Sequence, residues 1–465
     1  MTDTRPSSKD DVAAALNRSL KGRVIAPGDD DYDAARTIFY GGIDRRPAAI
    51  ARVAGAEDVA AVIRVARETG AELAVRSGGH SPAGHSTTEG GIVLDLSDMK
   101  ALEIDVDGGA AWAETGLTAG EYTGITAAYG LATGFGDTGS VGIGGITLAG
   151  GVGYLVRKHG LTIDSLLGAQ VVTAAGQILE IDETSHPDLF WAIRGGGGNV
   201  AVATRLRFRL HELPAVVGGM LMLPATGETI EGFLAEAGAA PDELSTIANV
   251  MPAPPMPFVP EEHHGKTVIF GLMCYAGDAE GGERALAPFR ALADPIADMV
   301  KPIPYPEIYP PDEEEYHPIA TAHTMFVDGV GTAEADTILE HLDASTAMMR
   351  VAQLRVLGGA VARVPADATA FAHRQSRIMV NVAALVERVE DRPTHEPWTR
   401  GFAAALHHGD DGAYVNFLGD EGADRTRAAY PGETWDRLRR IKARYDPPNL
   451  VRLNQNIPPA DADAA

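Results

Sequence analysis

Three glycine-rich segments in the first half of the chain restrict its possible folds more than any other feature. They are residues 76–80 (RSGGH), 134–153 and 194–199 (RGGGGN). The chain has 53 glycines among 465 residues, well above the usual share of about 7%. Glycine lets the backbone approach a partner closely, so successive N–H groups could cradle a polyanionic cofactor. The same residues could simply form tight turns in an α+β domain, and composition leaves both interpretations open.

Charge and cysteine content exclude several classes of function. Lys and Arg total 39 and Asp and Glu total 64, which gives a net charge of −25. Such a surface repels phosphate backbones and anionic lipid, so neither nucleic acid nor membrane is expected as a partner. The single cysteine, Cys274, excludes a disulfide framework and an iron–sulfur cluster, and no metal site is predicted.

The sequence also lacks the usual targeting signals. The first 20 residues contain no apolar segment typical of a secretory signal. The most apolar long run, residues 144–156, is shorter than the roughly 18 residues that a membrane span requires. We therefore expect a cytoplasmic protein.

Hydrophobic periodicity predicts a mixed fold with a change of character near residue 210. Helical spacing over 57–69, a capping box of Thr118 and Glu121, and a hairpin over 171–181 fall in the first part. Prolines and acidic residues then become frequent, and a strand over 413–418 (AYVNFL) and a helix over 434–444 come late. The predicted division is 1–210, 211–408, a segment 409–458 that returns to the first domain, and a disordered tail 459–465.

One motif is rejected. Gly134, Gly136 and Gly139 match the pattern G-x-G-x-x-G of dinucleotide-binding domains. That fingerprint requires a strand before it and a helix that opens within it. Here a helix is expected before it and more glycine follows, so a Rossmann domain is not predicted.

Four motifs in a fixed order carry a family resemblance. They are RSGGH followed closely by His85, then GSVGIGGITLAGGVGYLVRKHGLTIDSL, then HPDLFWAIRGGGGN, and finally YDPPNLVRLNQN. Together they resemble the berberine-bridge-enzyme-like branch of the vanillyl-alcohol-oxidase and p-cresol-methylhydroxylase flavoproteins. The resemblance covers most of the first 210 residues and about the last 50.

The resemblance implies an α+β fold and an FAD cofactor. Two α+β subdomains of the p-cresol-methylhydroxylase type would hold FAD, and an α/β domain with an antiparallel sheet would hold the substrate. His80 matches the histidine that bonds to the C8-methyl carbon of the flavin, and neutral imidazole is a competent nucleophile for that bond. The other positions implied to hold FAD are Arg76, Ser77, Gly78, Gly79, Ser81, His85, Thr138, Gly139, Ser140, Val141, Gly144, Gly145, Gly150, Val152, Gly198, Asn454 and Asn456.

Two departures from the family pattern are informative. Thr138 stands where many relatives carry a cysteine that forms a second bond to the flavin. The resemblance therefore implies a single covalent link, through His80. Ile146 replaces a histidine that supports negative charge near the reduced ring, so another donor or a backbone dipole must do so.

Further positions are assigned to catalysis and access. Tyr414 and Asn416 match the Tyr-x-Asn that the family points at flavin and substrate, and strand period would place both on one face. Tyr414 would act as a base if neighbouring positive charge or hydrogen bonds to its phenolate lowered the pKa of its phenol, with His373 and Arg374 as candidates for that help and for the substrate pocket. Val141 matches a residue that lines the approach of oxygen, and a small side chain there favours an oxidase.

The sequence therefore predicts an FAD-dependent oxidase. It would move hydride from a C–H bond next to an alcohol or hemiacetal oxygen to flavin N5, and O2 would reoxidise the flavin to give H2O2. A flavin-dependent amine or alkaloid oxidase, a dehydrogenase of the same fold and a carbohydrate-binding protein without chemistry are the alternatives. A small molecule and O2 are the expected partners; substrate identity and oligomeric state do not follow from the sequence.

Overall fold

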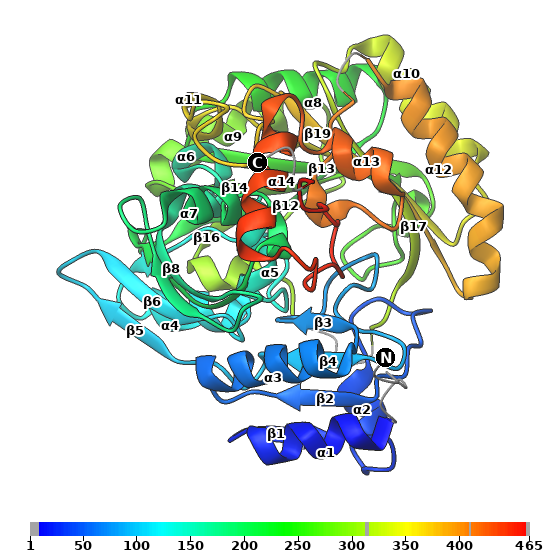
Figure 1. The fold of residues 1–465 in the computed structure, drawn as a ribbon. Coiled ribbons are helices and arrows are strands. Elements are labelled where there is room, and N and C mark those ends of the chain that lie inside the picture. The colour runs from blue at the N-terminus through cyan, green and yellow to red at the C-terminus, as the bar shows by residue number, and fades with distance from the viewer. Residues whose placement is uncertain (1–8, 312–315, 409–410, 462–465) are drawn as a thin grey trace.

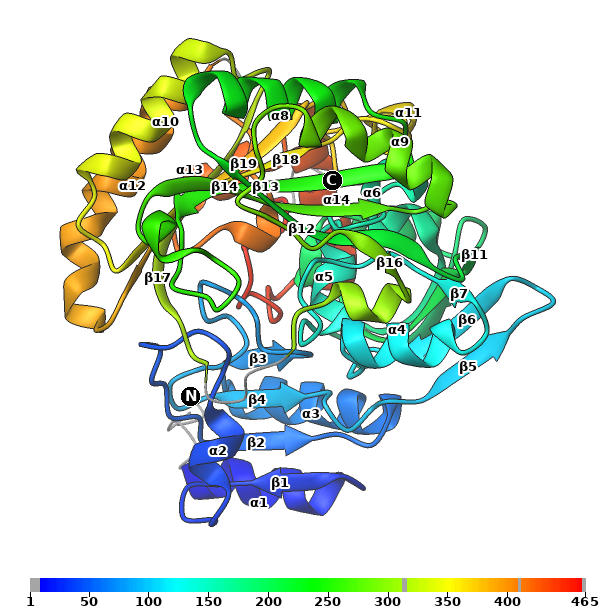
Figure 2. The same cartoon turned by 180° about the vertical axis from the view of Figure 1, so that it is seen from behind.

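Three sheets carry the fold of the protein (Figures 1 and 2). The computed structural model describes residues 9–311, 316–408 and 411–461. The predicted mixed α+β fold, with an antiparallel sheet in the middle region, is confirmed. Within these ranges no helix is both long and apolar enough to cross a membrane. The boundaries proposed at residues 210 and 408 stay a prediction.

The first sheet lies near the N-terminus and has the strand order β1-β2-β4-β3, with β4 parallel to both neighbours. Helix α3 packs on it because Val59, Val62, Ile63 and Ala66 repeat at helical spacing and are all buried. The elements of this part are α1 (Lys9–Ser19), β1 (Arg23–Ile25), α2 (Tyr32–Arg36), β2 (Ala49–Arg52), α3 (Ala56–Thr69), β3 (Leu73–Arg76) and β4 (Ile92–Asp95).

The second sheet is antiparallel, in the order β5-β6-β10-β8-β9. The predicted capping box is present, because Thr118 accepts from the N–H of Glu121 and the Glu121 carboxylate accepts from the N–H of Thr118. The elements are β5 (Leu102–Asp105), β6 (Ala110–Glu114), α4 (Ala119–Ala127), β7 (Leu131–Ala132), α5 (Ile143–Leu148), α6 (Val156–His159), η1 (Thr162–Ser165), β8 (Leu166–Val172), β9 (Ile178–Ile181), α7 (Pro187–Ile193), η2 (Gly197–Asn199), β10 (Val202–Arg209) and β11 (His211–Glu212).

The expectation of a helix directly before Gly134 is wrong. The short strand β7 stands between α4 and the glycines, because Leu131 and Ala132 pair with β11. That pairing is antiparallel, so the segment is not the first strand of a parallel βαβ unit. The rejection of a Rossmann domain therefore still agrees with the topology.

The third sheet has eight strands in the main order β15-β12-β14-β13-β18-β19-β17, with β16 paired to β12. Helices α8, α9, α10 and α12 cover its outer face, where they share one apolar cluster with the strands (Figures 1 and 2). The elements are β12 (Val216–Pro224), α8 (Gly227–Ala239), β13 (Leu244–Pro252), η3 (Glu261–His263), β14 (Thr267–Tyr275), α9 (Ala279–Arg290), β15 (Ala297–Asp298), β16 (Lys301–Ile303), η4 (Tyr305–Ile308), β17 (Ile319–Val327), α10 (Thr332–Ala344), β18 (Met349–Val356), α11 (Ala360–Arg363), β19 (Ile378–Val386), η5 (Val389–Asp391) and α12 (Arg392–Leu406).

The C-terminal segment returns to the first two sheets through η6 (Val415–Phe417), α13 (Ala423–Ala428) and α14 (Glu433–Tyr445). The predicted strand over 413–418 is wrong. The Phe417 N–H bonds to the Tyr414 carbonyl, which closes a turn, and among the described residues no strand pairs with this segment. Of the predicted tail, Ala460 donates its N–H to Arg439, and residues 462–465 lie outside the described ranges.

Candidate active site

A cavity of about 320 Å³ lies where the glycine-rich segments meet the C-terminal segment. Most of the residues predicted to hold a cofactor line it, together with the predicted pair Tyr414 and Asn416. The predicted cofactor residues on its wall are Ser77, Gly78, Gly79, His80, Ser81, His85, Thr138, Val141, Gly144, Gly145, Val152, Gly198 and Asn454.

Five predicted cofactor residues are not on this wall: Arg76, Gly139, Ser140, Gly150 and Asn456. Arg76 instead forms a buried ion pair with Asp95, at 2.8 Å, which ties the end of β3 to the end of β4. Gly150 lies under the rings of Phe371 and Tyr414, where a Cβ atom would come within 3.2 Å and 3.3 Å of them. Arg76 and Gly150 therefore lie behind the wall and not on it.

Two glycine loops approach each other more closely than any side chain would allow. A Cβ atom on Gly78 would lie 2.1 Å from the N atom of Gly142, and one on Gly142 would lie 2.2 Å from the N atom of Gly78. Gly79, with φ of 75°, then turns the chain in the left-handed region and presents His80 to the cavity. The loops thus form one floor that joins the first sheet to helix α5.

The imidazole of His80 is held by an aromatic neighbour that the sequence analysis missed. The ring of Phe39 stacks on that of His80 with centroids 4.1 Å apart and an interplanar angle of 18°. The second histidine on the wall, His85, has its pKa lowered to about 4, chiefly by burial, and is therefore neutral near pH 7. Two imidazole rings therefore line the cavity. Stacking on Phe39 fixes the plane of the His80 ring.

The phenolic oxygen of Tyr414 accepts three hydrogen bonds. It accepts hydrogen bonds from the N–H groups of Gly151 and Val152, at 3.0 Å and 3.2 Å, and from Nδ2 of Asn416, at 2.9 Å. Although the predicted strand is absent, the turn still brings Tyr414 and Asn416 together. Burial raises the pKa of Tyr414 above its ordinary value, and these donors oppose that rise without overcoming it. The condition for Tyr414 to act as a base, a lowered pKa, is therefore not met by the chain alone, and its role as a base stays a prediction.

The residues predicted to assist Tyr414, His373 and Arg374, do not line the cavity. Arg374 is fully buried and makes a bidentate ion pair with Asp164, at 2.7 and 2.8 Å, because its planar donor pair matches a carboxylate. Nε2 of His373 lies 3.0 Å from the carbonyl oxygen of Ala429. The cation that acts on Tyr414 is instead Arg355, on β18.

A second, larger cavity of about 710 Å³ adjoins the first. Phe39, Tyr40, Asp137, Thr138 and Phe417 line both. Its far wall is the inner face of the third sheet, where alternate positions of β18 and β19 point into it. These positions are Gln353, Arg355, Asn381, Ala383 and Leu385. The two cavities form one site with an inner glycine-lined part and an outer polar part.

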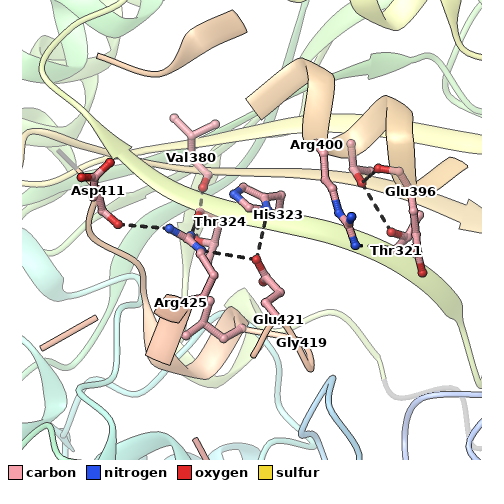
Figure 3. Close-up of polar contacts among 12 residues, drawn as sticks. Thr321, His323, Thr324, Val380, Glu396, Arg400, Asp411, Gly419, Glu421 and Arg425 are labelled. Atoms are coloured by element: carbon pink, nitrogen blue, oxygen red, sulfur yellow. Dashed lines mark hydrogen bonds and ion pairs between the residues drawn. The ribbon is translucent and has the colours of Figure 1, made fainter. Parts of the chain in front are cut away.

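A charged cluster joins the outer cavity to the C-terminal segment (Figure 3). Nδ1 of His323, on β17, lies 3.0 Å from Oε2 of Glu421. Arg425 contacts the same carboxylate and donates to the carbonyl of Thr324, at 2.7 Å. His323 and Arg425 hold the pKa of Glu421 below its ordinary value. The cluster therefore carries an ionised carboxylate and fixes the segment that follows Tyr414 against the sheet.

Among the described residues, no cysteine side chain lines either cavity. Thr138 lines both cavities at the position where the family pattern would place cysteine. Cys274 is fully buried on β14, outside both linings, and burial raises the pKa of its thiol to about 12. A thiolate bond to anything bound in the cavity is therefore excluded by position.

Several wall residues escaped the sequence analysis. Phe39 and Tyr40 precede a Gly-Gly pair, an aromatic dipeptide that could have drawn attention to this stretch. Asp137 lies inside the segment compared for cysteine and pairs with Arg355, 218 positions away in sequence. Two residues so far apart in sequence form no local pattern from which their contact could be predicted. His323 and Glu421 were missed for the same reason.

Comparison with known proteins gives consistent results. Residues 47–182 match the family described as "FAD binding domain", and residues 413–458 match "Berberine and berberine like". The chain is 31% identical to (R)-6-hydroxynicotine oxidase of Paenarthrobacter nicotinovorans, over 95% of this chain and 97% of that protein. It is 27% identical to xylooligosaccharide oxidase of Thermothelomyces thermophilus, over 96% and 95%. The solved structure of 6-hydroxy-D-nicotine oxidase from Arthrobacter nicotinovorans superposes with a TM-score of 0.84 at 29% identity, covering 95% of this chain and 99% of that one.

The inner cavity fits FAD. Gly145 and Gly198 line it, and no heavy atom of the protein lies within 4 Å of the position that a Cβ atom would take on either. Side chains there would fill space that the chain leaves open. Near the same wall, Nε2 of His85 and Oδ1 of Asn454 are buried and make no hydrogen bond within the described chain. An extended anionic cofactor with polar groups suits such a glycine-lined cradle.

Proposed function

The chain belongs to the berberine-like FAD-linked oxidoreductases, and from that premise we propose that it oxidises a substrate C–H bond next to an alcohol or hemiacetal oxygen with O2 as the final acceptor. Bound FAD would supply a two-electron acceptor, taking hydride at N5 and passing the electron pair to O2, which yields H2O2 with two protons. The observation that carries the proposal is the junction of the two cavities. There, Tyr414 and Asn416 line a cofactor cradle that opens to a polar chamber.

His80 would hold the flavin by a single covalent bond. The turn at Gly79 and the stacked ring of Phe39 fix its imidazole at the cavity wall. Thr138 in the cysteine position and the distant, protonated Cys274 leave no second attachment. A ring held in one orientation reacts and binds with less loss of entropy than a mobile one.

Residues around the glycine loops would hold the rest of the cofactor. The backbone from Ser77 to Gly79 and that of Gly144 and Gly145 face the inner cavity. Short peptide segments without side chains can present several N–H groups to one diphosphate. Ile146 contributes an apolar side chain and a carbonyl that accepts from Asn416, at 3.3 Å, so it supplies no positive charge.

The outer cavity would hold the substrate. Its wall offers amides, charged side chains and the aromatic rings of Phe39, Tyr40 and Phe417. Tyr414 in its phenolate form would take up the proton of the substrate heteroatom as hydride leaves, and the three N–H donors to its oxygen favour that ionised form. Val141, which lines the inner cavity and is partly buried, would leave space for O2.

The test is an anaerobic bleaching screen with cellobiose, benzyl alcohol and N-methylbenzylamine as probes of three substrate classes. Loss of the oxidised flavin absorbance with cellobiose or benzyl alcohol, followed by recovery in air with one H2O2 formed per flavin, is the expected result. A flavin that stays reduced in air and is reoxidised only by an added artificial electron acceptor would point to a dehydrogenase. A colourless protein that takes up no FAD on reconstitution would overturn the proposal.

Oxidation of a C–N bond is the second candidate. The named relative of high coverage, (R)-6-hydroxynicotine oxidase, is 31% identical over nearly the whole chain. The outer cavity also carries the carboxylate of Asp420, which suits a cationic substrate, whereas Glu396 and Glu421 on the same wall are already paired with arginines. Bleaching by the amine alone would favour this candidate over the alcohol oxidase.

A further inference from the structure

We propose that Arg355 and Asp137 are positioning residues that set, with opposite signs, how firmly Tyr414 holds its proton. The inference rests on the proposed function, because it assigns the control of the base in that reaction. Neither residue belongs to the motifs that carry the family resemblance.

The surroundings of the Tyr414 oxygen suit an anion. All three hydrogen bonds that it forms with described residues are donated to it, by Gly151, Val152 and Asn416. A phenolate accepts three such bonds readily, whereas a neutral phenol must also direct its own proton past these donors. Its ring packs near the rings of Phe371 and Phe417, which carry no charge. The pocket is therefore built like an oxyanion hole that lacks only a positive charge.

Arg355 supplies that charge from the adjoining wall. It is buried on β18, and its guanidinium lies 5.2 Å from the ring centroid of Phe417, which in turn packs edge-on against Tyr414 at 5.2 Å. The field of Arg355 lowers the pKa of Tyr414, against the larger effect of burial, which raises it. Both side chains are buried, with Arg355 4% and Tyr414 2% exposed, so bulk solvent screens their interaction only weakly.

Asp137 opposes Arg355. Its carboxylate forms an ion pair with the guanidinium, and Gln353 accepts from two nitrogens of the same group, at 3.1 Å and 2.7 Å. The other titratable groups that Asp137 faces are tyrosines. Burial raises the pKa of Tyr40 and of Tyr309 to about 12 and that of Tyr154 well above its ordinary value, so all three stay neutral near pH 7. Asp137 is therefore the charge that faces Arg355 and would weaken its field at Tyr414.

The experiment follows the protonation of Tyr414 directly, in the flavin-loaded protein without substrate. Tyrosines are replaced by 3-fluorotyrosine, which is more acidic, and the ¹⁹F resonance of Tyr414 is assigned by its loss in Tyr414→Phe. We expect the pKa of this residue to rise by about 1 in Arg355→Gln and to fall by about 1 in Asp137→Asn, as the charges require. Arg355→Lys, which keeps the positive charge, should return the pKa toward that of the parent protein.

The matched controls are Arg363→Gln and Asp242→Asn, which break an exposed ion pair of the same kind in the same part of the chain. They should leave the Tyr414 titration unchanged. Shifts of the same sign in Arg355→Gln and Asp137→Asn, no shift in either, or a resonance that stays protonated to the alkaline limit in all proteins would overturn the proposal. If Arg355→Gln does not fold, Asp137→Asn and Arg355→Lys still decide the sign.

The pH dependence of anaerobic flavin reduction gives a second readout, with the probe that bleaches fastest among cellobiose, benzyl alcohol and N-methylbenzylamine. Its inflection should move with the ¹⁹F titration in each variant. If no probe bleaches the flavin, the oxidase proposal fails while the titration can still succeed. If bleaching is normal and the titration does not respond, the control by Arg355 and Asp137 fails alone.

Discussion

We propose that covalent attachment of the cofactor depends on the side chain of His80. Its ring stacks on Phe39 and faces the inner cavity. In His80→Ala we expect covalently bound flavin to fall from one per chain to none, so that acid precipitation releases all of the colour. His85→Ala, on the same wall, should retain it. Yellow protein in the washed precipitate of His80→Ala would show that another residue forms the bond.

We propose that Val141 affects a different step, the reoxidation of the flavin by O2. It lines the inner cavity and is small enough to leave a path beside the flavin position. We expect Val141→Leu to slow reoxidation by O2 about tenfold, equivalent to about 1.4 kcal/mol of barrier, and to leave anaerobic reduction unchanged. Stopped-flow measurement of both half-reactions checks this. If both half-reactions keep their parent rates in Val141→Leu, the assignment of Val141 to an oxygen path is wrong.

At the scale of single residues, the sequence indicated contacts only where a local pattern exists. His80 follows two glycines and Thr138 occupies a compared position, so both were found. Arg355 was missed because its partners Asp137 and Phe417 come from distant parts of the chain. His373 and Arg374 were assigned to the pocket from their motif, but the carboxylate of Asp164 holds Arg374 in the core.

The paired glycine loops are the element that supports the cofactor floor. In Gly142→Ala, the added Cβ would lie 2.2 Å from a backbone nitrogen, so the loops must separate. We expect a loss of about 1–3 kcal/mol in the free energy of unfolding, together with weaker flavin binding. Gly238→Ala, in α8 with nothing within 4 Å of the new atom, is the control and should not destabilise the protein. Equal stability of the two variants would contradict the close approach.

Elements with strong local signals were predicted well. Helix α3 begins and ends within a residue of its expected range, and the capping box at Thr118 is present. The expected strand around Tyr414 was wrong because alternating side chains were read as strand period. In the structure, Asn416 reaches back to Tyr414 across a single turn, and among the described residues no strand edge is paired with it.

The stability of the whole molecule should decline on mild acidification. The pKa values of His85, His159 and His211 are lowered to about 4, 3 and 4, in each case mainly by burial. Below the ordinary histidine pKa of about 6.5, the unfolded chain therefore binds protons that the folded chain refuses. Stability is fully present above about pH 6.5 and is lost as the pH falls toward 4.

Thermal unfolding between about pH 7 and 5 checks this, because most carboxylates stay ionised over that range. The melting temperature should fall steadily with pH. Replacing the stacked pair His159 and His211, whose centroids lie 3.8 Å apart, by glutamine should flatten the slope, even if it lowers stability overall. A melting temperature independent of pH in the parent protein would contradict the burial of neutral histidines.

The return of the C-terminal segment has a consequence for biogenesis. Residues 414–418 and 453–455 form part of the wall of the inner cavity, and the buried Lys442–Asp446 pair anchors the segment beside Asn199. The cradle therefore stays incomplete until synthesis has passed residue 455, although most of its glycine-rich wall is made far earlier. Premature termination anywhere upstream of residue 414 leaves the cradle without this wall.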